Sequence, residues 1–196
     1  MKILGLTGGI GMGKSTAANA FRRLRVPIFD ADATVHALQG HGGRAVGPIG
    51  VAFQGTVRNG KVDREALRNA VLGKPEALTR LERIVHPLVR GAEQRFLAGA
   101  RRRAERLVVL DIPLLFETRG QGRCDLVVVV TAPAAVQRWR VLRRKGMTPE
   151  RLVAILARQM PDAEKRRRAD VVVQSGLSRY HAQRAIRKIV REIRRQ

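Results

Sequence analysis

A glycine-rich stretch near the start of the chain constrains the fold more than any other feature. Residues 2–16 read K-I-L-G-L-T-G-G-I-G-M-G-K-S-T, and Gly8, Gly13, Lys14 and Ser15 match the spacing G-x-x-x-x-G-K-[ST]. The apolar residues before the glycines predict a short buried strand, and the stretch after them predicts a helix. Strand, glycine loop and helix in this order are typical of a phosphate-binding loop, so we expect a nucleotide to bind here.

The chemistry of such a loop explains its residue types. Glycines allow positive φ and bring backbone N–H groups close to a ligand, and the N-terminus of the next helix adds further donors. Lys14 is expected to reach the β- and γ-phosphates of ATP, and the Ser15 hydroxyl to hold Mg²⁺. Thr16 is placed to donate to a phosphate farther back. ATP and Mg²⁺ are therefore the predicted cofactors, and a glycine turn with an incidental lysine is the alternative.

Length and composition favour a globular protein of the cytoplasm. The 196 residues, 44% of them hydrophobic, suit one domain with a real core. No apolar run approaches the roughly 18 residues of a membrane span, and the first residues read as a strand rather than a signal peptide. Cys124 is the only cysteine, which excludes an internal disulfide and suits a reducing compartment.

The charge is unusually positive. Lys and Arg total 39 against 16 Asp and Glu, a formal net charge of +23. This balance suits nucleic acid, an acidic membrane or a polyanionic substrate. Aromatic residues make up only 4% of the chain, so stacking platforms for single-stranded nucleic acid are scarce. Clusters such as 101–103 fall at ends of predicted helices, where solvated basic faces are common. We therefore expect no nucleic-acid or membrane partner, and a monomer or small homo-oligomer.

Apolar runs recur along the chain and predict further strands. They span residues 26–29, 107–110, 126–130 and 171–173, and helical patterns lie between them. Strands that alternate with helices are typical of a parallel sheet covered on both faces. The predicted fold class is therefore α/β, with three layers around a central parallel sheet.

The same patterns predict how this single domain is divided. The core is expected to comprise residues 1–35, 105–135 and 168–196. Residues 36–104 are mostly helical and are inserted between strands, as a substrate-side subdomain would be. Residues 136–167 form an arginine-rich helix–turn–helix that suits a lid over a triphosphate. For any single arginine of this lid, a solvated helix face is an equally good interpretation.

The insertion carries signals for its own elements. Asn59-Gly60 predicts a tight turn. Asp63 precedes a helix that should end near Gly73, and Pro75 begins the next helix at a position that proline favours. Pro87 lies inside that second helix and is predicted to kink it or divide it in two.

Three carboxylates follow predicted strands, where a parallel sheet opens its ligand crevice. Asp32 is placed to accept the proton of an attacking hydroxyl, while Asp30 could equally cap the helix that follows; capping is the alternative for both. Asp111 ends the 107–110 run, where an acidic residue can serve Mg²⁺. The apolar segment 112–117 after it predicts either a buried crossover or an apolar floor for an organic substrate.

Taken together, these motifs resemble the dephospho-coenzyme A kinase family. The matching pieces cover nearly the whole chain: L-T-G-G-I-G-M-G-K-S-T from Leu6, Asp30-Ala31-Asp32, G-K-V-D-R-E-A-L from Gly60, His86-Pro87-Leu88, I-P-L-L-F-E from Ile112, Gln137 with Arg140 and Arg144, Gln159-Met160, and Ala169-Asp170. The resemblance implies a P-loop NTPase fold like that of nucleoside monophosphate kinases, with a helical acceptor insertion and a helical lid. The implied reaction transfers the γ-phosphoryl of ATP to the ribose 3′-hydroxyl of dephospho-coenzyme A.

The resemblance also assigns residues to roles. Asp32, Lys14 and Arg140 match catalytic residues of the family. The ATP-binding positions would be Gly8, Gly9, Ile10, Gly11, Met12, Gly13, Lys14, Ser15, Thr16 and Arg144, with Ser15 on the metal. The acceptor-binding positions would be Asp32, His86, Arg90, Leu114, Leu115 and Glu117. Met12 replaces a residue that is usually small in the family, although its side chain can point outward.

Two other functions fit parts of the sequence. Another small-molecule kinase, acting on a nucleoside or nucleoside monophosphate, would share the fold and the loop. It would have less need of the His86-Pro87 and 113–117 pieces, because its acceptor is smaller. A P-loop protein that binds nucleic acid through its basic surface is the second alternative, and it predicts binding that weakens steeply with salt.

Overall fold

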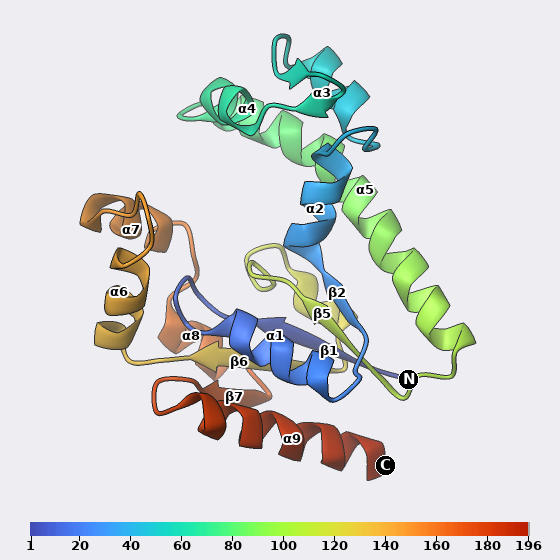
Figure 1. Ribbon diagram of the computed structural model, residues 1–196, viewed down its shortest axis with the longest axis vertical. Coiled ribbons are helices and arrows are strands. Elements are labelled where there is room, and N and C mark those ends of the chain that lie inside the picture. The colour runs from blue at the N-terminus through green and yellow to red at the C-terminus, as the bar shows by residue number, and fades with distance from the viewer. Residues whose placement is uncertain (196) are drawn as a thin grey trace. The chain divides into compact units, whose positions relative to one another are not determined.

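The computed structural model of the protein describes residues 1–195, which form two compact units (Figure 1). The core unit comprises Met1–Phe29 and the chain from Ala100 onward, and the insertion unit comprises Asp30–Gly99. The sequence patterns placed the boundaries of the insertion at residues 36 and 104. Each unit has its own buried apolar residues and is described by itself below.

The core unit is organised around a five-stranded sheet. Its strands are β1 (Lys2–Thr7), β2 (Ile28–Asp30), β5 (Leu107–Asp111), β6 (Leu126–Thr131) and β7 (Val171–Gln174). They are ordered β2-β5-β1-β6-β7, and β1 pairs in parallel with both β5 and β6, as β6 does with β7. The predicted parallel sheet is confirmed, with a strand at each of the predicted apolar runs.

Successive side chains along each strand point to opposite faces of the sheet, and both faces are packed. On one face, Leu4 and Leu6 of β1 pack with residues of α1 (Lys14–Arg23) and α9 (Arg179–Arg195). On the other face, Gly5 lies against Leu115, and Thr131 of β6 bonds to α8 (Asp162–Arg167). Every residue of β5 is buried, as expected for a central strand covered on both sides. The predicted three-layer α/β fold is therefore confirmed.

The segment between β6 and β7 contains three helices. They are α6 (Ala134–Leu142), α7 (Pro149–Leu156) and α8, and a short 3₁₀ turn, η1 (Gly120–Arg123), precedes β6. The Thr148 hydroxyl accepts the Arg151 N–H and caps α7, with Pro149 at the first helical position. The helix ends at Leu156, and the chain continues through turns to Pro161, which precedes α8.

The insertion unit is built mostly from helices. These are α2 (Ala31–Gln39), α3 (Val46–Ala52), α4 (Arg64–Val71) and α5 (Pro75–Arg102), the last of which runs on into the core unit. Two short strands, β3 (Val57–Arg58) and β4 (Lys61–Val62), pair as a hairpin. The predicted turn at Asn59-Gly60 is confirmed, and both residues have the positive φ of a two-residue hairpin turn.

Two local features of the insertion unit follow from single residues. Asp63 caps α4 by accepting the N–H groups of Glu65 and Ala66, and the bond from Ala66 lowers the pKa of this carboxyl. Pro87 does not divide α5, because the helix is continuous from Pro75 to Arg102. The missing N–H removes one helical bond, while neighbours such as Val85 and Leu88 pack in the apolar cluster of the unit. Of the two predicted outcomes, division of the helix is therefore wrong, and the kink stays a prediction.

Within residues 1–195, no helix combines the length and the apolar character that crossing a bilayer requires.

Candidate active site

The phosphate-loop residues lie between the end of β1 and the start of α1. Gly13 precedes α1 with φ 89°, a left-handed conformation that glycine adopts without strain. No side chain caps the helix. Within the described part of the chain, no acceptor bonds the N–H groups of Gly11, Gly13, Lys14 and Ser15. Unsatisfied donors gathered at the start of a helix suit a phosphate group.

Lys14 is held at this site by Asp111. Its Nζ lies 2.5 Å from Oδ1 of Asp111, the last residue of β5, which pairs in register with Leu6 of β1. The two side chains are 16% and 4% exposed. A nearly buried carboxylate therefore neutralises the lysine and fixes its position beside the loop.

The donor set also fits Mg²⁺. Among the described residues there is no cluster of three or more His, Cys, Asp or Glu side chains that could hold a metal ion by themselves. Mg²⁺ retains several waters and binds through one or two protein oxygens together with the phosphates of its nucleotide. The exposed Ser15 hydroxyl and the Asp111 carboxylate provide such oxygens beside the loop.

The two lid arginines have different surroundings. Arg140 lies in the last turn of α6, and its guanidinium donates to both the hydroxyl and the carbonyl of Ser175, at 3.0 and 2.8 Å, and to the carbonyl of Gly11 at 3.4 Å. It therefore lies against the loop and not on a solvated helix face. Arg144 is exposed, and within residues 1–195 it forms no ion pair.

The Met12 side chain is buried in the structure. It is 3% exposed, and its sulfur accepts the N–H of Ala132 at 3.1 Å. The Met12 carbonyl accepts the Ser175 hydroxyl at 2.6 Å. The outward orientation that the sequence allowed is therefore not adopted, and a flexible thioether is suited to such a packed position.

The segment after β5 combines buried and exposed apolar residues. Leu114 is 40% exposed. Leu115 is completely buried, and a Cβ on Gly5 would lie only 2.8 Å from its side chain. Leu115 is therefore a core residue of this structure, and its place in the acceptor site stays a prediction. Of this pair, only the Leu114 side chain is exposed.

Glu117 joins this segment to the chain around α8. Its Oε1 lies 2.8 Å from Nζ of Lys165 and accepts the Met160 N–H at 2.8 Å. The Lys165 side chain is 1% exposed, and it also donates to the Pro113 carbonyl at 3.4 Å. These contacts describe a structural ion pair made through Oε1, and the predicted role of Glu117 toward the acceptor stays a prediction.

This buried pair predicts a stability effect. Glu117→Ala leaves the Lys165 ammonium without a counter-charge, so we expect the free energy of unfolding to fall by about 3–5 kcal/mol. Adding Lys165→Met should recover most of that loss, because the unpaired charge is removed. Lys188→Met is the control: its pair with Glu192 is 76% and 57% exposed, and the loss should stay under about 1 kcal/mol. Urea unfolding measures the stability of all three variants. Unchanged stability in Glu117→Ala would mean that the ion pair does not stabilise the fold, and it would leave a purely ligand-binding role for Glu117.

The remaining predicted residues lie on the insertion unit. Asp30 caps α2, because its Oδ1 accepts the Ala33 N–H at 2.9 Å. Asp32 lies in the first turn of the same helix, is exposed, and within residues 1–195 forms no ion pair or side-chain hydrogen bond. His86 and Arg90 are exposed on α5, four residues apart and so on the same side of that helix.

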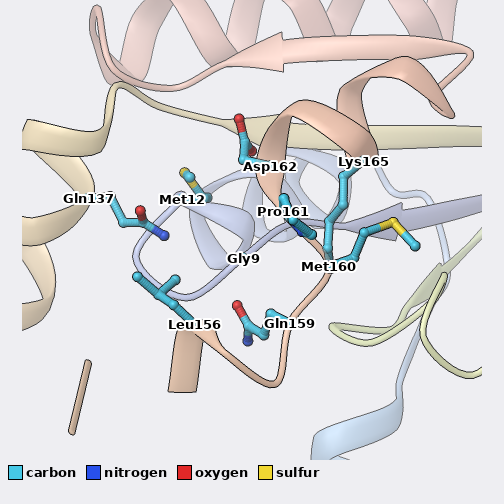
Figure 2. Close-up of a pocket in the computed structure, with 9 residues that line it drawn as sticks. All are labelled: Gly9, Met12, Gln137, Leu156, Gln159, Met160, Pro161, Asp162 and Lys165. Atoms are coloured by element: carbon cyan, nitrogen blue, oxygen red, sulfur yellow. The ribbon is translucent and has the colours of Figure 1, made fainter. Parts of the chain in front are cut away.

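A pocket of about 330 Å³ borders the loop within the core unit (Figure 2). Its lining residues are Gly9, Met12, Gln137, Leu156, Gln159, Met160, Pro161, Asp162 and Lys165. Gln137 and Gln159 belong to motifs in the sequence, but those motifs predict no role for either residue. No motif of the sequence includes Lys165. Lys165 begins a run of four basic residues, a pattern that predicts solvent exposure rather than burial.

Comparison with known proteins identifies the family. Residues 2–179 match the family model described as dephospho-CoA kinase. A dephospho-CoA kinase of Paramagnetospirillum magneticum is 66% identical over 85% of this chain and 78% of its own length. One from Mesorhizobium japonicum is 54% identical over 100% of this chain and 98% of its own. The crystal structure of TT1252 from Thermus thermophilus superposes with a TM-score of 0.82 at 37% identity, covering 97% of each chain. This chain therefore belongs to the dephospho-CoA kinase family.

Proposed function

We propose that this kinase transfers the γ-phosphoryl group of ATP to the ribose 3′-hydroxyl of dephospho-CoA, giving CoA and ADP. The observation that carries the proposal is the family match over residues 2–179, which includes the phosphate loop, His86-Pro87 and the segment after β5. The free N–H groups and Lys14 beside that loop supply the local chemistry that a triphosphate needs.

The transfer needs positioning and charge stabilisation more than covalent chemistry from the protein. The 3′-oxygen forms a bond to the γ-phosphorus while the bond from that phosphorus to the β,γ-bridging oxygen breaks, and ADP leaves. Lys14, the loop N–H groups and the lid residues Arg140 and Arg144 stabilise the negative charge that spreads over the transferred group. Ser15 would hold Mg²⁺, which would supply further positive charge beside the phosphates of the nucleotide.

The acceptor residues complete the proposed site. Asp32 takes the proton of the 3′-hydroxyl as the new bond forms; its carboxylate has no partner among the described residues and is exposed. His86, Arg90 and Leu114 bind the remainder of dephospho-CoA. We place the enzyme in the cytoplasm as a monomer or small homo-oligomer, with neither nucleic acid nor a membrane as its partner.

An acceptor panel tests this function. ADP release is coupled to a colour reaction with ATP and Mg²⁺ present, and dephospho-CoA is compared with AMP, CMP and adenosine as acceptor. We expect turnover with dephospho-CoA alone, and CoA as its product. Preference for a small nucleotide would preserve the phosphate-loop assignment and overturn the acceptor site. Addition of duplex DNA should leave the rate unchanged, because the acceptor site binds one small molecule.

A further inference from the structure

The peptide groups on either side of Ile10 in the phosphate loop are bonded by side chains from two other segments. The Ile10 N–H donates to Oε1 of Gln159 at 3.1 Å, and the Ile10 carbonyl accepts from Nε2 of Gln137 at 2.8 Å. Gln137 lies on α6 and is 8% exposed, whereas Gln159 follows α7. The two glutamines therefore reach the loop from opposite ends of the lid segment, residues 136–167.

Elementary chemistry fixes which way each carboxamide is turned. A backbone N–H only donates and a carbonyl oxygen only accepts. The atom of Gln159 that meets the Ile10 N–H must therefore be oxygen, and the atom of Gln137 that meets the carbonyl must be nitrogen. One glutamine is an obligate acceptor and the other an obligate donor, although their side chains are identical.

The absence of a side chain at Gly9 makes room for both carboxamides. A Cβ at this position would lie 3.3 Å from Oε1 of Gln159 and 3.6 Å from Nε2 of Gln137. Figure 2 shows both glutamines around the pocket that Gly9 also lines. The polar ends of the two side chains thus meet at the Gly9–Ile10 backbone, where the Gly9 carbonyl also accepts the Met12 N–H at 3.2 Å.

We propose that Gln137 and Gln159 are positioning residues, a glutamine clamp that holds the Gly9–Ile10 backbone in its ATP-binding conformation. The inference rests on the proposed function, since it assigns the clamp to the same phosphate loop. A glycine-rich loop samples many backbone conformations, and ordering it costs conformational entropy. The clamp orders the loop before ATP binds, so ATP binding loses less conformational entropy and is tighter. The backbone N–H donors of the loop are then already in place during phosphoryl transfer.

The opposite roles of the two glutamines provide a matched pair of variants. Gln137→Glu and Gln159→Glu each add one negative charge beside the same residue, Ile10, so both are expected to weaken ATP binding by repulsion. Gln159→Glu keeps an acceptor for the Ile10 N–H. Gln137→Glu loses the donor and brings a carboxylate against the Ile10 carbonyl. Charge alone predicts equal losses, and the clamp predicts unequal ones.

ATP affinity is measured by titration calorimetry without acceptor, so the outcome does not depend on the identity of the acceptor. We expect Gln137→Glu to lose at least about tenfold more affinity than Gln159→Glu. In steady-state assays with dephospho-CoA, the KM for ATP should rise in the same order while the KM for dephospho-CoA stays constant. Equal losses in the two variants would overturn the clamp and leave the proposed function intact.

A second pair covers the case in which Gln137→Glu fails to fold. Gln137→Met and Gln159→Met remove the bonds to Ile10 at nearly constant size and without added charge. Each should weaken ATP binding several-fold with the melting temperature little changed, and unaltered affinity in both would contradict the clamp. Failure of the unsubstituted chain to bind ATP would overturn the proposed function and the clamp together.

Discussion

Turnover of Lys14→Ala is expected to fall by about a thousandfold or more, the scale of a lost charge-stabilising donor at a transferring group. Lys14 lies beside the uncapped start of α1 and is the only lysine within residues 8–16. Removing it leaves charge on the transferred phosphoryl uncompensated. The coupled ADP-release assay with ATP, Mg²⁺ and dephospho-CoA measures the loss.

The ion pair with Asp111 dictates the control for this variant. Lys14→Ala also removes the lysine counter-charge from a carboxylate that is 4% exposed, and losing the partner of a buried charge destabilises the fold by itself. The double variant Lys14→Ala/Asp111→Asn removes that charge, so it should recover thermal stability but no activity. Near-normal turnover in either variant would overturn the assignment of the phosphate-loop site.

Asp32→Asn is expected to transfer phosphate at least about a hundredfold more slowly, the usual effect of losing a general base. The amide cannot take the proton of the 3′-hydroxyl, while its size and its place on α2 are unchanged. ATP affinity, measured by calorimetry, should match that of the unsubstituted chain. The expected signature is thus a lower kcat with ATP binding preserved.

Asp30→Asn is the matched control, two residues earlier at the N-cap of the same helix. Asp30 caps α2 through the Ala33 N–H, and asparagine caps helices about as well as aspartate. Its stability and its rate should therefore remain close to those of the unsubstituted chain. If Asp32→Asn retained the full rate, the proton acceptor would have to be sought elsewhere.

Much of the core unit was predictable because its signals are local. The strand before Gly8, the glycine loop and the helix after it follow from fifteen consecutive residues, and the apolar runs gave the other strands directly. A continuous apolar run has few other stable arrangements than a strand buried on both faces. From the sequence, either Asp30 or Asp32 could cap α2, since Asp30 precedes the helix and Asp32 lies in its first turn. The structure assigns the cap to Asp30.

The features that sequence reasoning missed depend on contacts between distant segments. Lys165 belongs to a basic run, yet it forms a buried ion pair with Glu117, which lies 48 positions earlier in the chain. Gln137 and Gln159 are ordinary polar residues until the fold brings both to Ile10. Helix α3, Val46–Ala52, contains two glycines and a proline, and it persists through burial of Ile49 in the cluster of its unit. In each case tertiary packing outweighs the local signal.

The glutamine clamp has a mechanical consequence for the lid segment. A segment that is hydrogen-bonded near both ends to one short stretch of backbone cannot rotate as a rigid body, because rotation about one hydrogen bond would break the other. Under the proposed clamp, any displacement of Arg144 would come from bending within the segment, at the turn between α6 and α7 that contains Gly146 with φ 75°. The base of the segment would meanwhile keep the phosphate loop in shape.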